Sequence, residues 1–325
     1  MSHLPVSAKV GSLGAFWPLL EPVLDALAPQ RICEVGVESG GFAAQLLAWS
    51  RLRGCRYLGI DPEPPGDMPD VVRGTSLEVL PRLEPCDAYF IDGDHNYHTV
   101  RGELDAIAGG AERSGTRAPL IFVHDVAWPW GRRDMYYAPE RIPAEHRHPF
   151  SAELGVVLHG DELVDGGLRD PGRYVIACSA GGARNGVLTA VEDFLAASRA
   201  SGAAWQTILV PAAFGLAILY RPDAVPPACA QQLQRLLTAA ETMDGFLRLI
   251  ESNYMTLYLY GEDVQRHADD LQRHADGLQR HAGALENTYA GLQSAYADLS
   301  AHAAALLEEY RKLESSYHAV KNERA

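Results

Sequence analysis

The sequence predicts an α/β fold, in which a doubly wound, seven-stranded sheet is followed by a long C-terminal coiled coil. Between residues 13 and 220, short apolar runs alternate with longer segments of helical spacing. Such alternation is typical of a mostly parallel sheet with helices on both faces. From residue 263 onward a seven-residue repeat takes over, which is typical of a coiled coil.

Four apolar runs have the length and composition of strands that are buried on both faces of a sheet. One segment of helical spacing separates the first run from the second, and another separates the third from the fourth. Two further runs, at residues 205–210 and 215–220, are so close together that they predict an antiparallel pair at the end of the sheet. The four runs are "RICEVGV" (31–37), "YLGID" (57–61), "CDAYFID" (86–92) and "PLIFVHD" (119–125).

The heptad repeat follows a proline-rich boundary, "RPDAVPPA", at residues 221–228. Leucine fits the d position of each heptad, and alanine or tyrosine fits the a position four residues later. Because unbroken leucine phasing over about eight heptads needs a partner to cover it, we expect a homo-oligomer or a pairing with another helix. The d positions are Leu271, Leu278, Leu285, Leu292, Leu299, Leu306 and Leu313, and the a positions are Ala275, Ala282, Tyr289, Tyr296, Ala303, Tyr310 and Tyr317.

These features divide the chain into an α/β domain (1–226), a helical connector (227–262) and a coiled coil (263–325). Within the first domain, residues 127–185 form a long insertion, and loops of this length are usually functional or disordered. Because the insertion is rich in aromatic residues, we expect an ordered lid over a ligand site, with a structural flap or an oligomer contact as the alternative. The candidates for stacking on a sugar or aromatic ring are Trp128, Trp130, Tyr136 and Tyr137.

Composition and charge exclude several classes of function. The formal net charge of −14 opposes binding to nucleic acid or to an anionic membrane surface, because both require a basic surface. No apolar run is long enough to cross a bilayer, and the first residues lack the pattern of a signal peptide. The five cysteines are scattered and odd in number, which argues against a disulfide framework. We therefore expect a cytoplasmic protein that binds a small molecule or a glycan, without nucleic acid and without membrane insertion.

A glycine-rich segment, "EVGVESGG" at residues 34–41, follows the first strand and opens a helix. Glycines at such a turn let the backbone approach a ligand and direct amide N–H groups at it. Asp61 ends the second strand, where a carboxylate can accept hydrogen bonds from ribose hydroxyls. The spacing is not G-x-G-x-x-G and there is no Walker lysine, which disfavours a nicotinamide dehydrogenase and a phosphate-cradling NTPase.

Acidic and imidazole side chains end the third and fourth runs, in "YFIDGDHNY" and "PLIFVHDV". In a doubly wound sheet these strands are neighbours, so Asp92, His124 and Asp125 converge at their carboxyl ends, where such sheets bind ligands. Two carboxylates can hold a hard ion such as Mg²⁺, whereas a histidine ligand favours Mn²⁺, Fe²⁺ or Zn²⁺. His124 can also lie outside the ligand set, and Asp92 and Asp94 can instead cap the following helix.

The order of these motifs resembles the class I S-adenosylmethionine-dependent methyltransferases, over about residues 13–220. The E-x-G-x-x-x-G-G loop, the acid that ends the second strand and the "FIDGDH" strand carry the resemblance. "IDGDHNYHTVRGEL" followed by "FVHDV" is similar to the subgroup of sugar and catechol O-methyltransferases, many of which use a divalent cation. The resemblance implies a Rossmann-like sheet that binds S-adenosylmethionine. The cofactor-binding residues that it implies are Glu34, Gly36, Ser39, Gly40, Gly41, Asp61, Ser76 and Asp92.

The resemblance also implies a metal-assisted reaction. In that family, acids at the ends of the fourth and fifth strands hold Mg²⁺, which here corresponds to a site made by Asp92, His124 and Asp125, with Mn²⁺ as the alternative ion. His95 lies where the catechol enzymes place their general base, and an imidazole pKa of about 6.5 suits proton removal near neutral pH. His124 is the rival base, so the expected catalytic residues are Asp92, His95 and His124.

The resulting prediction is an S-adenosylmethionine-dependent enzyme that O-methylates a hydroxyl of a sugar, a polysaccharide or a natural product. N-methylation without a metal is one alternative. Another is a non-catalytic scaffold, in which the methyltransferase-like domain is a relic and the coiled coil carries the function.

Overall fold

The structure is a computed structural model that describes residues 12–66, 68–158 and 160–323. The chain forms two compact units, Met1–Gly261 and Glu262–Ala325. The first unit is an α/β domain, and the second consists of the later part of helix α6 (Pro227–Glu323). Residues 1–11, with which the expected first domain begins, and residues 324–325, with which the expected coiled coil ends, lie outside the described residues.

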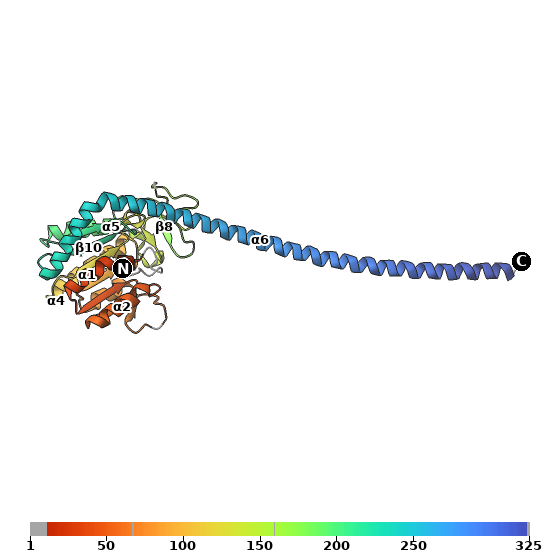
Figure 1. The fold of residues 1–325 in the computed structure, drawn as a ribbon, viewed down its shortest axis with the longest axis horizontal. Helices are drawn as coiled ribbons and strands as arrows, with labels where there is room; N and C mark the ends of the chain where they lie inside the picture. The colour runs from red at the N-terminus through yellow and green to blue at the C-terminus, as the bar shows by residue number, and fades with distance from the viewer. Residues whose placement is uncertain (1–11, 67, 159, 324–325) are drawn as a thin grey trace, which may run out of the picture. The chain divides into compact units, whose positions relative to one another are not determined.

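Figure 1 shows the fold of the first unit, in which β10 is labelled. Its sheet has seven strands in the order β3-β2-β1-β4-β5-β10-β9. The five strands from β3 to β5 are parallel, and β10 runs antiparallel to both of its neighbours. The chain therefore winds outward from β1 in one direction and from β4 in the other, which confirms the doubly wound, seven-stranded prediction. The strands are β1 (Arg31–Val35), β2 (Arg56–Asp61), β3 (Val71–Arg73), β4 (Ala88–Ile91), β5 (Leu120–His124), β9 (Gln206–Val210) and β10 (Leu216–Tyr220).

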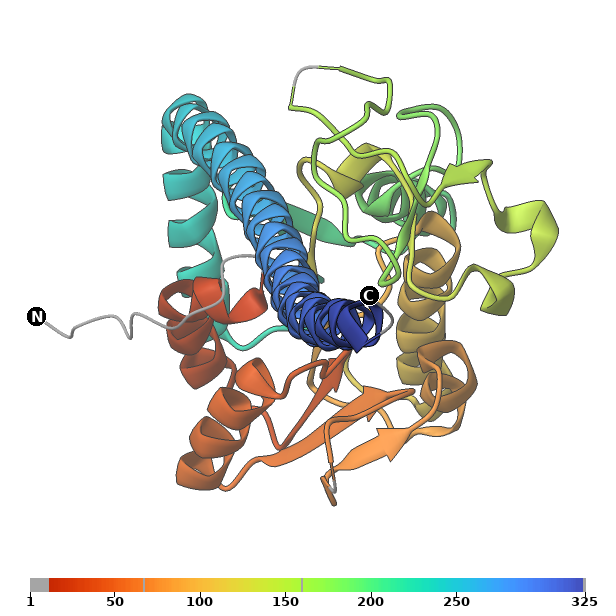
Figure 2. The same ribbon diagram turned by 90° about the vertical axis from the view of Figure 1, so that its right-hand side faces the viewer.

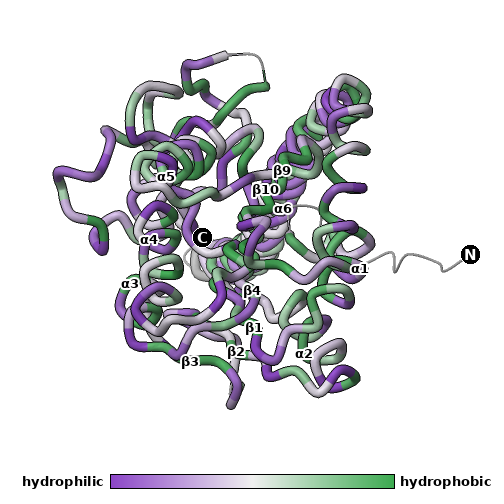
Figure 3. The backbone as a smooth tube through the Cα atoms, turned by 90° about the vertical axis from the view of Figure 1, so that its left-hand side faces the viewer, coloured by the Kyte–Doolittle hydropathy of each residue, from purple (hydrophilic) through white to green (hydrophobic). Residues whose placement is uncertain are grey.

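Helices cover both faces of this sheet. Figures 2 and 3 show α1 (Trp17–Leu27) and α2 (Gly41–Arg53) on one side, and α4 (Tyr97–Ser114) on the other, together with α3 (Ser76–Val79) and α5 (Val187–Ala200). Alternate residues of the central strands β1, β4 and β5 pack into one of two hydrophobic cores, as their spacing requires. One core contains Ile32, Phe90 and Phe122 with α1, α2 and the start of α6, and the other contains Cys33, Tyr89 and Ile121 with α4 and α5.

The register of the central strands determines which residues meet at the carboxyl edge. Val35 of β1 lies beside Ile91 of β4, and Ile91 lies beside Val123 of β5. The residues that follow these three along the chain therefore emerge side by side. This register brings the glycine-rich segment and the two acid-containing strand ends to one edge of the sheet.

The described residues of the insertion, 127–158 and 160–185, contain a small sheet of their own, β6-β8-β7 (Met135–Tyr136, Val175–Ala177 and Phe150–Ser151). Asp134 anchors it to the α/β core, because its buried carboxylate accepts hydrogen bonds from the backbone N–H of Tyr97 at 2.8 Å and of Gly186 at 2.7 Å. These strands of two or three residues were not predicted, since their runs are too short to show an alternating pattern.

The long C-terminal helix is confirmed, whereas its pairing in a coiled coil remains a prediction. In the second unit, each heptad leucine from Leu271 to Leu313 is more than half exposed, with the lowest value, 55%, at Leu306. Among the described residues, no helix has the length and apolar character that crossing a membrane requires.

Glu103 provides a test of the packing of α4 on the sheet. Its side chain is fully buried, and neither carboxylate oxygen has a hydrogen bond of acceptable geometry within the described part of the chain. Burial raises the pKa of Glu103 to about 8, although the nearby Ser76 hydroxyl opposes the shift. The folded protein therefore keeps a proton that the unfolded chain releases above its ordinary pKa of 4.5.

We predict that the free energy of unfolding falls as the pH rises from about 4.5 to about 8, because the unfolded chain gains stability by releasing the Glu103 proton that the folded protein keeps. Glu103→Gln removes this ionisation, so its melting temperature relative to wild type should increase between pH 5 and pH 8. Thermal unfolding at several pH values measures the difference, with the exposed Glu112→Gln on the same helix as control. Parallel curves for wild type and Glu103→Gln contradict the prediction.

Candidate active site

Asp92, His124 and Asp125 meet at the carboxyl ends of β4 and β5, as the sequence predicts. The Nδ1 atom of His124 lies 2.9 Å from Oδ1 of Asp92 and 3.0 Å from Oδ2 of Asp125. The imidazole side chain is 0% exposed. One ligand atom from each of the three residues lies within 4.8 Å of the others, a spacing that suits a metal ion.

The orientation of the His124 ring follows from its second nitrogen. Nε2 lies 3.0 Å from the carbonyl oxygen of Ala213, and because a carbonyl can only accept, Nε2 carries a proton and donates. Nδ1 is therefore the atom that faces both carboxylates. Burial by itself lowers the pKa of His124, but the charges of Asp92 and Asp125 outweigh it and raise that pKa well above its ordinary value. Either a proton or a metal ion can balance this cluster.

His95 is the fourth member of the cluster. Its Nε2 lies 3.2 Å from Oδ2 of Asp125 and 3.7 Å from Oδ1 of Asp92. Neither ring nitrogen has a hydrogen bond of acceptable geometry within the described residues, although the side chain is only 12% exposed. Burial opposes the charged form, but the carboxylates of Asp125 and Asp92 raise the pKa of His95.

The first residues of the described chain also contact the cluster. The backbone N–H of Leu13 donates to Oδ2 of Asp92 at 3.1 Å. The ring of Phe16 meets the ring of His124 edge-on, with centroids 5.8 Å apart. Burial raises the pKa of Asp92, but the charges and hydrogen bonds of His124 and His95 outweigh it and hold that pKa below its usual range. Sequence reasoning did not find Leu13 or Phe16, because a backbone amide and a buried aromatic ring leave no motif.

The glycine-rich segment lies at the same edge, and its glycines have different roles. Gly36 has φ +89°, and a Cβ added to it would lie 2.4 Å from the Cα of Gly93. This glycine is therefore needed for the loops after β1 and β4 to touch. Gly40 has φ +76° and precedes α2, whose N-terminus has no side-chain cap. Gly41 and the exposed Ser39 stand beside that open helix end.

Asp61 holds the glycine-rich segment in place. Its Oδ2 accepts hydrogen bonds from the backbone N–H of Val37 at 2.9 Å and of Glu38 at 3.0 Å. Its Oδ1 accepts from the N–H of Glu63 at 2.7 Å. Asp61 thus fixes the conformation of the glycine-rich segment. A ligand bound at this edge of the sheet would contact both.

Glu34 and Ser76, the other expected cofactor residues, are both buried. Burial raises the pKa of Glu34 to about 8, while a hydrogen bond donated by the Tyr57 hydroxyl opposes the shift. Burial thus favours the neutral form of the Glu34 carboxyl, which can itself donate a hydrogen bond. Ser76 begins α3 beyond the end of β3.

The insertion contacts both the glycine-rich segment and the cluster. Arg173 forms an ion pair with Glu38, and Arg141 forms one with Glu63 at 3.0 Å. The ring of Tyr137 lies edge-on to that of His95, with centroids 5.8 Å apart. Two of the four aromatic residues expected to stack on a ligand, Trp130 and Tyr136, are instead buried at 5% and 0% exposure, while Trp128 and Tyr137 keep exposed surface.

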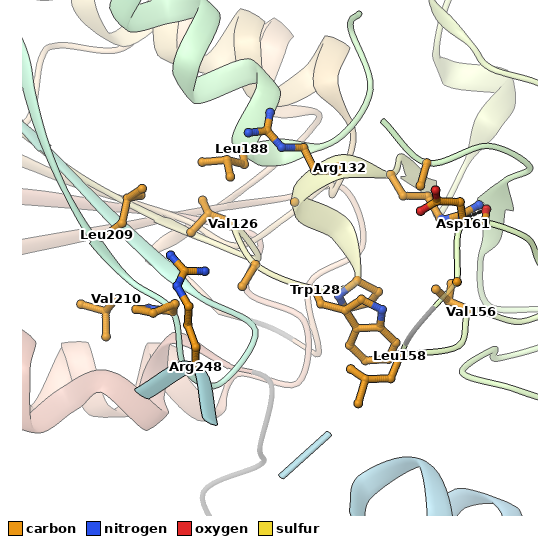
Figure 4. Close-up of a pocket in the computed structure, with 17 residues that line it drawn as sticks. Val126, Trp128, Arg132, Val156, Leu158, Asp161, Leu188, Leu209, Val210 and Arg248 are labelled. Carbon is orange, nitrogen blue, oxygen red and sulfur yellow. Dashed lines mark hydrogen bonds between the residues drawn. The ribbon is translucent and has the colours of Figure 1, made fainter. Parts of the chain in front are cut away.

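A cavity of about 330 Å³ opens directly after Asp125, between the insertion and the β9–β10 hairpin (Figure 4). Its wall is largely apolar, with the indole of Trp128 on one side. The arginines that line it have protein partners: Arg132 pairs with Glu192 at 2.6 Å, and Arg248 pairs with Asp244 at 2.9 Å. None of the four cluster side chains lines this cavity.

No protein-family model and no curated protein matches the chain, but solved structures do. The SAH-bound methyltransferase PaMTH1 of Podospora anserina is 16% identical, over 67% of this chain and 82% of its own, with a TM-score of 0.38. The SAH complex of a Bacillus cereus O-methyltransferase is 14% identical, over 67% and 84%, with a TM-score of 0.34. The Mg-SAM structure of CmcI-D160 is 18% identical, over 50% and 70%, with a TM-score of 0.29. At these identities and scores, nothing about the chemistry of this chain follows from the matches.

Gly36→Ala should lower the free energy of unfolding by about 2 to 4 kcal/mol. The added Cβ would overlap the backbone of Gly93, and alanine would have to adopt a left-handed backbone conformation that it disfavours. Chemical denaturation measures the loss. Gly41→Ala is the matched control: its added Cβ meets nothing closer than 3.9 Å, so stability should stay the same or rise by up to about 1 kcal/mol. Equal effects of the two substitutions would refute the role assigned to Gly36.

Proposed function

We propose that this protein is an S-adenosylmethionine-dependent methyltransferase that O-methylates a hydroxyl of a sugar, a polysaccharide or a natural product with the help of a divalent cation. The observation that carries the proposal is the convergence of two carboxylates and two imidazoles at the ends of β4 and β5, on the carboxyl edge of a doubly wound sheet. The glycine-rich segment ends at the same edge, so a cofactor bound there lies next to the cluster.

The cofactor site is assigned to the ends of β1 and β2. The open N-terminus of α2, with Gly40 and Gly41, suits the carboxylate of an amino acid, because helix N-termini attract anions. Asp61 keeps one unused lone pair, on Oδ1, for a ribose hydroxyl, and a protonated Glu34 can donate to an acceptor atom. Ser39 and Ser76 complete the proposed set. When bound, S-adenosylmethionine supplies a methyl group activated by the sulfonium charge.

The residues that would hold a divalent cation are Asp92, His124 and Asp125. They fit such an ion, because the Ala213 carbonyl keeps the proton of His124 on Nε2 and leaves Nδ1 directed at both carboxylates. Two carboxylates suit Mg²⁺, and the imidazole makes Mn²⁺ the alternative. When bound, the cation lowers the pKa of a coordinated hydroxyl and orients it.

His95 is proposed as the general base. Its imidazole has no hydrogen bond of acceptable geometry to the described residues, and so can accept the proton of an acceptor hydroxyl. Asp125, 3.2 Å from Nε2, then stabilises the imidazolium that forms. The ring of Tyr137 packs edge-on against His95 from the side of the insertion.

The acceptor is proposed to enter beneath the insertion. Trp128 and Tyr137 are the aromatic residues that keep exposed surface for stacking on a sugar or aromatic ring. The apolar cavity after Asp125 offers space for a non-polar part of the acceptor.

One observation favours a second candidate, a methyltransferase that uses no metal, as in N-methylation. A proton on Nδ1 of His124 places one positive charge between the two carboxylates, and the raised pKa of His124 favours that proton. In this case the cluster positions the acceptor without binding an ion.

Calorimetric titration of S-adenosylmethionine into the purified protein, first with EDTA and then with Mg²⁺ or Mn²⁺, tests the proposal. We expect micromolar cofactor binding, a separate metal-dependent heat, and loss of that heat in Asp92→Asn. Turnover of Asp92→Asn should fall by at least about 100-fold. Asp94→Asn is the control, because Asp94 bonds to Thr99 outside the cluster. Absence of cofactor binding overturns the proposal, and cofactor binding without the metal heat selects the second candidate.

A further inference from the structure

The loop between β9 and β10 contains three consecutive residues in the left-handed backbone region. Ala213 has φ +51°, Phe214 has φ +67° and Gly215 has φ +88°. For alanine and phenylalanine this conformation costs about 1 to 3 kcal/mol each, so it persists only where contacts impose it. An added Cβ on Gly215 would lie 2.6 Å from the backbone nitrogen of Ala127, which shows how closely the loop packs on the segment after β5.

Glu251 of α6 holds this loop. Its carboxylate accepts hydrogen bonds from the N–H of Ala213 at 2.6 Å and of Phe214 at 2.9 Å. The residue is 8% exposed. Successive backbone N–H groups that point the same way form a concave anion site, and here the anion is a side chain of the same chain. The edge-on contact of Phe214 with Tyr258, at 6.0 Å between centroids, adds a second link to α6.

The carbonyl groups of the same two residues bind the chain on both sides of Asp125. The Ala213 carbonyl accepts from Nε2 of His124 at 3.0 Å, and the Phe214 carbonyl accepts from the N–H of Ala127 at 2.8 Å. Asp125 itself has φ +61°. The N–H groups of the loop therefore bind Glu251, while its carbonyl groups bind His124 and Ala127, which lie on either side of Asp125 in the sequence.

We propose that Glu251 is a positioning residue for the cluster. By holding Ala213 and Phe214 in the left-handed conformation, it keeps the Ala213 carbonyl on Nε2 of His124, and Nδ1 then faces Asp92 and Asp125. Without this carboxylate the loop relaxes, and the His124 ring loses the hydrogen bond that fixes its orientation. Only the effect on metal binding rests on the proposed function, since the hydrogen bond of His124 exists with or without a methyl transfer.

The test uses the full-length protein, selectively labelled with ¹⁵N-histidine, without metal. In wild type, the Nε2–H of His124 should give a slowly exchanging resonance, assigned by its loss in His124→Asn. Glu251→Gln, which keeps the shape of the side chain, should speed the exchange of this proton at least about 10-fold and weaken Mn²⁺ binding about 10-fold, as expected for removal of a supporting contact. Cofactor binding should be unchanged.

Two further variants separate this role from a general loss of stability. Glu241→Gln changes an exposed acid of the same helix and should leave the resonance and the metal affinity as in wild type. Ala213→Gly relieves strain in the loop, so Ala213→Gly/Glu251→Gln should recover part of the protection that Glu251→Gln loses. A protected Nε2–H in Glu251→Gln overturns the proposal, even if the wild-type protein binds neither metal nor S-adenosylmethionine.

A separate observation concerns the second unit, where an apolar stripe runs along α6. The stripe consists of the heptad leucines from Leu271 to Leu313 and of four tyrosines that are 63% to 76% exposed. Exposed apolar surface of this extent on one face marks an interaction site. The tyrosines are Tyr289, Tyr296, Tyr310 and Tyr317.

The sequence of the stripe fits a second copy of itself in the antiparallel direction. An antiparallel pair places each a position beside a d position of the partner, so every layer combines a leucine with an alanine or a tyrosine. We align the two helices so that residue 264 of one copy lies opposite residue 317 of the other. The layers then pair Leu271 with Tyr310, Leu278 with Ala303, Leu285 with Tyr296, and Leu299 with Ala282. A parallel pair instead stacks alanine on alanine and tyrosine on tyrosine, and brings Glu309 at g towards Glu314 at e of the partner. We propose an antiparallel homodimer through this stripe.

Light scattering of the full chain should give about twice the monomer mass of 35.4 kDa. Leu285→Asp/Leu292→Asp should give the monomer mass with an unchanged α/β domain, whereas the control Ser294→Asp, on the opposite side of the helix, should stay dimeric. In a Cys178→Ser background, which removes the exposed cysteine, Val264→Cys should form disulfides when mixed with Tyr317→Cys and none alone. A monomeric wild type, or disulfides in Val264→Cys alone, overturns the proposal.

Discussion

Two carboxylates share one buried imidazole at the end of the sheet, and the surrounding structure depends on this arrangement. Asp125 is 4% exposed and the side chain of Asp92 is 14% exposed, so their negative charges need a positive charge beside them, because desolvation of an unpaired charge costs several kcal/mol. A protonated His124 supplies one positive charge there. Its position is in turn fixed by the Ala213 carbonyl, so the charge balance of the cluster depends on the loop between β9 and β10.

Backbone strain gathers around the same point. Asp125, Ala213 and Phe214 are all left-handed without being glycine, and Gly36 touches the backbone of the loop that carries Asp92. Such conformations persist where packing imposes them, and they concentrate at functional sites. The neighbouring α6 helix imposes part of this one through Glu251. The strain therefore supports the identification of the edge as a site, independently of any sequence motif.

The strand ends could be predicted because they follow from a rule of parallel sheets: residues after "FI" of β4 and "FV" of β5 must emerge together. The contacts of Leu13 and Glu251 could not, because their partners lie 79 and 38 residues away and act through backbone atoms, which any residue has. The short strands β3 and β6 to β8 were missed for a related reason. They have at most three residues each and exist because a neighbour offers hydrogen bonds.

Methyl transfer with a metal ion and methyl transfer without one differ in what lies between His124, Asp92 and Asp125. Nδ1 of His124 and the carboxylates of Asp92 and Asp125 converge on a point that a proton fills in the absence of a metal. A divalent ion would have to displace that proton, so metal binding and proton release would be coupled there. Because the Ala213 carbonyl already holds the other ring proton, the displaced one could only be that on Nδ1.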